Sequence, residues 1–286
     1  MIFLKNMKNI YLDWHISDQK QDVLNITFRR FLCSEVEVLI DTNEVITGLD
    51  IVIHQGFNSA NYNDKLMELL LLCDVLKRNE VKSITLIAPF LPYTRQDKTM
   101  DMKSSLGCKV VADLLNYAMI DRLVTFDLHA PQLEGFFCAK VEHKTMLPQL
   151  FEDISKNYHI LDTVIVFPDA GAASRAKNYI QNYEFDIAIF NKTRKDNSVQ
   201  MKIIGNVEGM NCVIVDDMID SGGTILTAAQ LLKDNGVKNI AIYATHGIFS
   251  GNAMEKFANS PIDQIVVTNT LAQQDLPKLK ILNIPI

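Results

Sequence analysis

The sequence predicts an α/β protein whose two halves are each built on a mainly parallel sheet flanked by helices. Short apolar runs alternate with amphipathic helical patterns from end to end of the chain, and this alternation is typical of α/β units. The 286 residues contain more predicted strands than suit one sheet, which favours two smaller sheets. We expect the boundary near residues 141–146, giving domains at residues 1–143 and 144–286, with the last strand of the chain free to pack back on the first domain.

Each element of the first half follows from a local pattern. Short apolar runs predict strands at Val36–Ile40, Asp50–His54, Ser83–Ala88 and Arg122–Phe126. Apolar residues at helical spacing predict helices at Asp64–Arg78 and Leu106–Ala118. A long polar loop, Pro89–Ser105, follows the strand Ser83–Ala88.

The second half repeats this alternation. Apolar runs predict strands at Thr163–Phe167, Asp186–Phe190, Asn211–Val215, Asn239–Ala244 and Gln264–Thr268. Helical spacing predicts helices at Ala170–Asn182, Thr224–Asp234 and Asn252–Phe257. A densely charged loop, Asn191–Ser198, follows the strand Asp186–Phe190. Ligands of open α/β sheets bind beyond the carboxyl ends of the strands, so both polar loops are candidate site segments.

The composition excludes several classes of partner. A formal net charge of −6 argues against a broad nucleic-acid or anionic-membrane surface. The most apolar stretch, Leu66–Leu76, contains Glu68 and Asp74 and is far shorter than a membrane span. The five cysteines are scattered without a Cys-x-x-Cys pair, and Cys73 and Cys212 lie in apolar runs. That usage is typical of a reducing compartment, so we expect a cytoplasmic protein.

The most informative segment runs from Cys212 to Ile225. An apolar strand ends in Asp216-Asp217, and the loop Asp220-Ser221-Gly222-Gly223-Thr224 leads directly into a helix. Backbone N–H groups and the positive end of a helix dipole then point to one place, which binds a phosphate. The carboxylates would repel that phosphate unless they face sugar hydroxyls or Mg²⁺, and a ribose 5-phosphate offers both ends. The alternative is an ordinary turn in which Asp220 or Ser221 caps the helix.

Other polar residues follow predicted strands. His129, two residues after Asp127, is a candidate to bind a metal or the phosphates that hold the metal, or else a structural histidine. Asp169 is a candidate Mg²⁺ ligand or a helix cap. Lys192 and Arg194 lie in the charged loop. If that loop is mobile and closes over a substrate, they would neutralise the charge that develops during phosphoryl transfer. The alternative is that they form part of a solvated surface. The planar donor fork of Arg95 and the amide of Gln96 suit a nucleotide.

Three further segments narrow the possibilities. They are Pro92-Tyr-Thr-Arg-Gln-Asp97, Asp127-Leu-His-Ala-Pro-Gln-Leu-Glu-Gly-Phe-Phe137 and Tyr243-Ala-Thr-His-Gly-Ile-Phe-Ser-Gly-Asn-Ala253. With Val215–Thr224, they resemble the ribose-phosphate diphosphokinase family, also called phosphoribosyl pyrophosphate (PRPP) synthetases. The resemblance begins near Phe31 and continues to the C-terminus.

The resemblance implies two phosphoribosyltransferase-like domains, an ATP side at residues 1–143 and a ribose 5-phosphate side at residues 144–286. The implied reaction transfers a diphosphoryl group from Mg-ATP to the C1 hydroxyl of ribose 5-phosphate, and AMP is released. Matching positions imply ATP contacts at Phe31, Glu35, Arg95, Gln96 and His129. They imply ribose 5-phosphate contacts at Arg194, Asp216, Asp217, Asp220, Ser221, Gly222, Gly223 and Thr224. They imply metal-associated residues at His129 and Asp169, and catalytic residues at Lys192 and Arg194. The family also implies a homo-oligomer, a dimer or hexamer, with an ATP site shared between subunits.

The chain departs from the family pattern in two places. Where the family reads Phe-Ser-Asp-Gly-Glu, this chain reads Phe31-Leu-Cys33-Ser34-Glu35, which lacks the central carboxylate. Residues 98–105 lack most of the family's arginines. Two alternatives to an active synthetase therefore stay open: a non-catalytic regulatory paralogue and a phosphoribosyltransferase.

Overall fold

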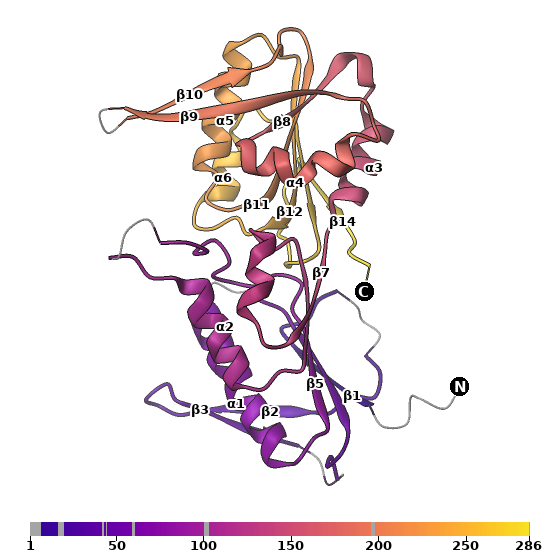
Figure 1. The fold of residues 1–286 in the computed structure, drawn as a ribbon, viewed down its shortest axis with the longest axis vertical. Coiled ribbons are helices and arrows are strands. Elements are labelled where there is room, and N and C mark those ends of the chain that lie inside the picture. The colour runs from indigo at the N-terminus through magenta and orange to yellow at the C-terminus, as the bar shows by residue number, and fades with distance from the viewer. Residues whose placement is uncertain are drawn as a thin grey trace. The chain divides into compact units, whose positions relative to one another are not determined.

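The computed structural model describes residues 7–16, 20–41, 43, 45–58, 61–99, 103–195 and 198–285, without the side chains of residues 192–195 and 198–200. It confirms the predicted α/β class, with parallel sheets flanked by helices (Figure 1). The chain divides into two compact units, Met1–Lys144 and Thr145–Ile286. Among the described residues, no helix combines the length and the apolar character that crossing a membrane requires.

The unit Met1–Lys144 contains a five-stranded parallel sheet in the order β1-β4-β5-β6-β7. Its strands are β1 (Met7–Leu12), β4 (Asp50–Gln55), β5 (Ser83–Ile87), β6 (Arg122–Phe126) and β7 (Lys140–Lys144). Its helices are α1 (Tyr62–Arg78), α2 (Gly107–Tyr117) and the short 3-10 helix η1 (Pro131–Phe136). A separate antiparallel hairpin is formed by β2 (Ile26–Arg30) and β3 (Val36–Ile40).

The unit Thr145–Ile286 contains a seven-stranded sheet in the order β10-β9-β8-β11-β12-β13-β14. The strands are β8 (Thr163–Phe167), β9 (Asp186–Lys195), β10 (Ser198–Ile204), β11 (Asn211–Ile219), β12 (Asn239–Gly247), β13 (Gln264–Thr268) and β14 (Leu279–Leu282). The helices are α3 (Leu147–Asn157), η2 (Ile160–Asp162), α4 (Ala170–Ile180), α5 (Gly223–Asp234) and α6 (Ala253–Ala258). All pairs are parallel except β9 with β10.

Helices lie on both sides of this second sheet (Figure 1). A buried cluster joins the sheet to α5 and α6 through Ile225, Leu232 and Phe257. Burial of one such side chain stabilises the fold by roughly 1.5–3 kcal/mol. Because both faces are covered, the interior strand β8 is buried along its whole length, and every residue after Thr163 is apolar. Cys73 and Cys212 are buried and unpaired, as their apolar surroundings predict.

Several sequence-based expectations need correction. The helix α3 and the strands β1, β2, β7, β10 and β14 were not predicted. Residues 191–195, expected in a loop, continue β9 and pair with β10, because an antiparallel partner satisfies their backbone groups (Figure 1). The last strand, β14, pairs with β13 rather than with the sheet of the first unit.

Candidate functional site

The acidic pair lies in the C-terminal part of β11, which continues to Ile219, four residues beyond the predicted end of this strand at Val215. The Oδ1 atom of Asp216 accepts a hydrogen bond from the backbone N–H of Asp217 at 2.9 Å. Arg175, on α4, donates from Nη2 to Oδ1 of Asp217 at 3.3 Å and lies 3.8 Å from Oδ1 of Asp216. Burial raises the pKa of Asp216 well above its usual value, the charge of Asp217 raises it further, and the charge of Arg175 opposes the shift.

The turn after β11 depends on Gly222. This residue has a φ of +79° and is the N-cap of α5. A Cβ atom there would lie 2.8 Å from the ring of Phe257, so glycine is required both by conformation and by space. The N-cap position of α5 is therefore held by Gly222 and not by Asp220 or Ser221, the two residues that the alternative reading placed there.

The start of α5, which follows the acidic pair by a few residues in the chain, presents backbone donors. The N–H groups of the first turn of a helix have no partner within the helix. Ser221, Gly223 and Thr224 are exposed, and a Cβ atom at Gly223 would meet nothing within 4 Å. This open, donor-rich turn suits a phosphate group.

Asp169 is the N-cap of α4. Its Oδ1 atom accepts a hydrogen bond from the backbone N–H of Ala172 at 2.9 Å. The structure therefore bears out the capping role that was one of two expectations for this residue. Asp169 is nevertheless exposed. Its carboxylate therefore stays accessible to a cation while it caps the helix.

Lys192 and Arg194 occupy alternate positions of β9. They are opposite Met201 and Val199 of β10 in the antiparallel register. Their backbone therefore belongs to a hairpin rather than to a loop; their side chains lie outside the described part of the chain.

Strand order brings these segments of the second unit to one edge. β8 lies between β9 and β11 and is parallel to both. Parallel strands direct their carboxyl ends to the same edge of a sheet, where ligands of such sheets bind. Asp169 follows β8, and Lys192 and Asp216 lie in β9 and β11 beyond the residues that pair with β8.

In the first unit, His129 lies in a loop that follows β6. The N–H of Leu128 donates to Nε2 of His143 at 3.0 Å, and Nδ1 of His143 lies 2.8 Å from Oε1 of Glu134. His143 therefore accepts through Nε2 and donates through Nδ1. The N–H of Asp127 also donates to the carbonyl oxygen of Lys144 at 2.9 Å, so β7 positions this loop.

Arg95 and Gln96 lie in the loop after β5, and both are exposed. β5 and β6 are neighbours and parallel, so this loop and the His129 loop leave the same edge of the sheet. Oε1 of Gln96 accepts from the Ser105 hydroxyl at 3.3 Å. A Cβ atom at Gly107 would lie 2.3 Å from the same oxygen, so the start of α2 and Gln96 fit closely together.

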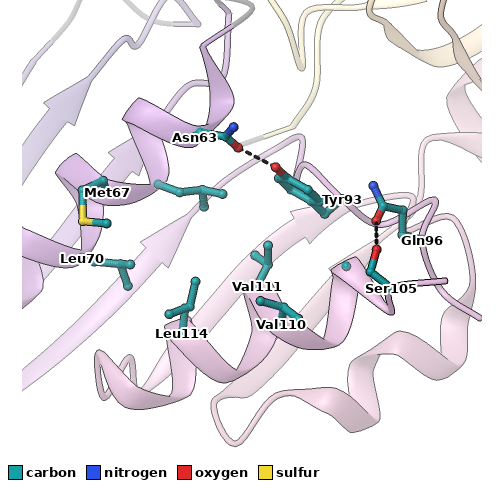
Figure 2. A pocket seen from close by; sticks show the side chains of 11 residues that line it. Asn63, Met67, Leu70, Tyr93, Gln96, Ser105, Val110, Val111 and Leu114 are labelled. Carbon is teal, nitrogen blue, oxygen red and sulfur yellow. Dashed lines mark hydrogen bonds between the residues drawn. The ribbon is translucent and has the colours of Figure 1, made fainter. Parts of the chain in front are cut away.

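A cavity of about 340 Å³ lies beside Gln96, between α1 and α2 (Figure 2). Its floor is apolar and includes Met67 and Val110. At its polar end the Tyr93 hydroxyl donates to Oδ1 of Asn63 at 2.5 Å (Figure 2).

The segment Phe31–Glu35 forms the turn of the β2–β3 hairpin. The N–H of Phe31 donates to the carbonyl oxygen of Glu35 at 2.9 Å, and Ser34 has a φ of +72°. Phe31, Cys33 and Glu35 are all exposed. Arg30 links the hairpin to α1, because its Nη2 atom lies 2.9 Å from Oε1 of Glu68. Asp101, in the other divergent segment at residues 98–105, lies outside the described residues.

Sequence reasoning missed two residues of these sites. Arg175 is two turns into a helix and His143 lies on an unpredicted strand, and both act through long-range side-chain contacts. The sequence signals were weak: an arginine six positions after Asp169, and a histidine near the expected domain boundary.

The described residues contain no group of three His, Cys, Asp or Glu side chains that could hold a metal ion. Mg²⁺ is commonly held by one or two carboxylates together with substrate phosphates. The exposed carboxylate of Asp169 fits that mode of binding, in which the nucleotide supplies most of the oxygen ligands.

Comparisons with known proteins agree with this geometry. A family model described as the N-terminal domain of ribose phosphate pyrophosphokinase matches residues 3–118. Another, described as the phosphoribosyl synthetase-associated domain, matches residues 193–286. The ribose-phosphate pyrophosphokinase of Aquifex aeolicus is 40% identical over 268 residues, covering 92% of this chain and 84% of that protein. The protein of the same name from Vibrio cholerae is 42% identical over 249 residues, covering 86% and 78%.

A solved structure gives the same result in three dimensions. The crystal structure of phosphoribosylpyrophosphate synthetase from Mycobacterium smegmatis matches with a TM-score of 0.88 at 34% identity, covering 98% of this chain and 95% of that one. Similarity of this extent in sequence and in fold shows that the chain belongs to the ribose-phosphate pyrophosphokinase family.

Proposed function

We propose that this protein transfers the diphosphoryl group of Mg-ATP to the C1 hydroxyl of ribose 5-phosphate, giving PRPP and AMP. The observation that carries the proposal is the end of β11. There, two carboxylates lie next to a glycine turn that opens a helix. Carboxylates accept hydrogen bonds from vicinal sugar hydroxyls, and the helix start binds the 5-phosphate.

The acceptor site would consist of Asp216, Asp217 and the turn Asp220–Thr224. Asp216 and Asp217 hold the ribose hydroxyls, and the N–H groups of the turn hold the phosphate. This arrangement fixes the C1 hydroxyl relative to the end of β9. Orientation of two reactants in this way supplies a large share of catalysis in phosphoryl transfer.

The donor site would include Arg95, Gln96 and His129, with Phe31 and Glu35 from the β2–β3 hairpin. His129 in the first unit and Asp169 in the second are each proposed as metal-associated residues, and Mg²⁺ held with the nucleotide would neutralise phosphate charge. Lys192 and Arg194 stabilise the charge that develops on the transferring group, and Arg194 also contacts ribose 5-phosphate.

The hairpin also supports a homo-oligomer. Phe31 is 45% exposed and Leu32 109% exposed at its turn, and such apolar tips are typically covered by a partner. We propose a dimer or hexamer in which this turn completes the ATP site of a second copy. The unpaired cysteines fit a cytoplasmic enzyme.

The second candidate function is a non-catalytic regulatory subunit. Cys33, exposed at the hairpin turn, stands where the family has a carboxylate, which favours altered nucleotide recognition.

A direct assay tests the proposed activity: purified protein receives ribose 5-phosphate, Mg²⁺ and ATP, and AMP and PRPP are measured. Absence of both products with every nucleoside triphosphate and phosphate concentration tried would exclude the proposed activity.

The variant Lys192→Ala tests the proposed transition-state role. We expect turnover to fall by roughly a hundredfold or more while ribose 5-phosphate still binds, because the lost group acts mainly on the transition state. Lys202→Ala is the matched control, since it removes an exposed lysine from the same hairpin. Equal loss of binding and turnover in Lys192→Ala would make this lysine a ground-state ligand instead.

A further inference from the structure

Arg175 is a charged residue of the second unit that lies close to the proposed ribose-binding carboxylates. Arg175 extends from α4 to the end of β11, where its Nη2 atom lies 3.3 Å from Asp217 and 3.8 Å from Asp216. The side chains of Asp216 and Asp217 are only 19% and 7% exposed. Ion pairs shielded to this degree are weakly screened by solvent, so the contact matters more than a surface pair does.

The charges around the pair are unbalanced without this arginine. Asp217 and Arg175 are the charged groups that act on Asp216, and the residue opposite Asp216 on β12 is Ala244. Two adjacent carboxylates with restricted access to water cannot both remain ionised unless a cation offsets them. Burial and Asp217 raise the pKa of Asp216, and Arg175 counteracts that rise.

Arg175 also lies close to the first turn of α4. A Cβ atom at Gly171 would be 3.1 Å from Oδ1 of Asp169 and 3.8 Å from Nη1 of Arg175. The glycine therefore leaves space next to both side chains. The guanidinium is thus placed between the acidic pair and the end of α4 that carries Asp169.

We propose that Arg175 is a positioning residue that holds Asp216 and Asp217 as an oriented, ionised pair for the vicinal hydroxyls of ribose 5-phosphate. The inference rests on the proposed function, since it names the group that prepares the acceptor site. A hydroxyl group donates to an ionised carboxylate, whereas a protonated carboxyl group offers a competing donor. Loss of Arg175 should therefore weaken ribose 5-phosphate binding, and more strongly at lower pH.

The test measures ribose 5-phosphate binding by calorimetry, without nucleotide, between pH 6 and 8.5. Arg175→Met removes the charge and keeps much of the volume, whereas Arg175→Lys keeps the charge. Lys177→Met is the matched control, because it removes an exposed charge from the same helix. In parallel, carbon-13 NMR of labelled aspartate follows the titration of Asp216 in the same variants.

We expect Arg175→Met to weaken ribose 5-phosphate binding about tenfold or more, the scale of a lost charge-assisted hydrogen bond. The acidic limb of its binding profile and the Asp216 midpoint should both move to higher pH. Arg175→Lys should restore the midpoint and only part of the affinity, because an ammonium lacks the planar fork. Lys177→Met should match the wild type.

Two outcomes would overturn the inference: an unchanged Asp216 midpoint in Arg175→Met, or an Arg175→Lys variant that behaves like Arg175→Met in both measurements. If Arg175→Met weakens inorganic phosphate binding as much as ribose 5-phosphate binding, Arg175 is a phosphate ligand and the inference also fails. If the wild type binds no ribose 5-phosphate but the midpoint still moves, the proposed function fails, and Arg175 retains only its control of the pair's ionisation.

Discussion

Asp216 is a buried carboxyl group whose ionisation costs the folded protein stability. Its raised pKa means that the folded state holds this proton more tightly than the unfolded state does. Ionised Asp216 therefore destabilises the fold at neutral pH, and the penalty disappears as pH falls below the unfolded pKa of 3.8. A carboxylate kept at such a cost is typical of a functional site.

We predict that Asp216→Asn stabilises the protein while it weakens ribose 5-phosphate binding. The amide oxygen can still accept from the N–H of Asp217, but the buried negative charge is gone. We expect Tm to rise because the cost of burying a charge is removed, and each 1 kcal/mol gained would correspond to roughly 2–4 °C. Thermal unfolding at pH 7.5 checks this, with the exposed Asp186→Asn as control. A lower Tm for Asp216→Asn would contradict the account.

Gly107 allows a second prediction at this scale. In Gly107→Ala, the new methyl group would lie 2.3 Å from Oε1 of Gln96, so the flexible Gln96 side chain must move. We expect little loss of stability but a KM for ATP raised severalfold, with an unchanged KM for ribose 5-phosphate. Gly135→Ala, where a Cβ atom meets nothing within 4 Å, is the control. Equal changes in both KM values would show a general disturbance.

The residues at strand ends could be predicted because local patterns place them. Asp169 and Asp216 each follow an apolar run. A parallel sheet directs the carboxyl ends of its strands to one edge, so it brings such residues to the same side. Arg175 and His143 could not be found in this way. Their roles depend on which side chains meet after folding, and no local pattern encodes that contact.

At the scale of elements, α5 and the turn before it are set by one glycine. Gly222 combines a φ of +79° with a Cβ position 2.8 Å from Phe257. We expect Gly222→Ala to destabilise the protein by about 1–3 kcal/mol, because it adds backbone strain and overpacking. Ribose 5-phosphate binding should weaken as well, since the donors at the start of α5 shift.

Gly223→Ala is the matched control for this prediction. It lies at the next position, begins α5 and has open space around its Cβ position. Urea unfolding of both variants should show a clear loss for Gly222→Ala and a change near zero for Gly223→Ala. Similar losses in the two variants would contradict this account, because alanine favours the helix over glycine and Gly223 has open space around its Cβ position.

Elements with strong apolar runs were predicted closely, and exposed or edge elements were not. β3, β6, β8 and β13 have the predicted bounds, since each is a compact apolar run. β10 and the end of β9 are polar and charged, so they resemble a loop in the sequence. Pairing with each other makes them strands, and pairing is not visible in either segment alone.

At the scale of the whole molecule, the two compact units carry buried groups with opposite responses to pH. In the first unit, burial lowers the pKa of His54 from 6.5 to about 4. The centroid of the His54 ring lies 4.4 Å from that of Tyr11, on which it stacks, and 4.8 Å from that of Trp14, which it meets edge-on. Its Nε2 atom lies 3.0 Å from Oδ1 of Asn9. In the second unit, the pKa of Asp216 is raised.

When the pH falls, these two pKa shifts change the stability of the protein in opposite directions. The unfolded chain protonates His54 below pH 6.5, whereas the folded chain does so only near pH 4. Stability from this group is therefore lost as pH falls between these values, by up to about 3 kcal/mol. Asp216 has the reverse effect, because its protonation relieves a penalty in the folded state.

We therefore predict that the first unit loses stability relative to the second as pH falls from 7.5 to 5. Hydrogen exchange should show faster opening of β1 and β4 at pH 5, after correction for intrinsic rates, while β11 keeps or gains protection. In His54→Gln, which cannot titrate, the pH dependence of β1 and β4 should largely disappear, whatever the variant costs at pH 7.5. A uniform loss of protection across both units, or the same pH dependence in His54→Gln, would show that other groups control the acid response.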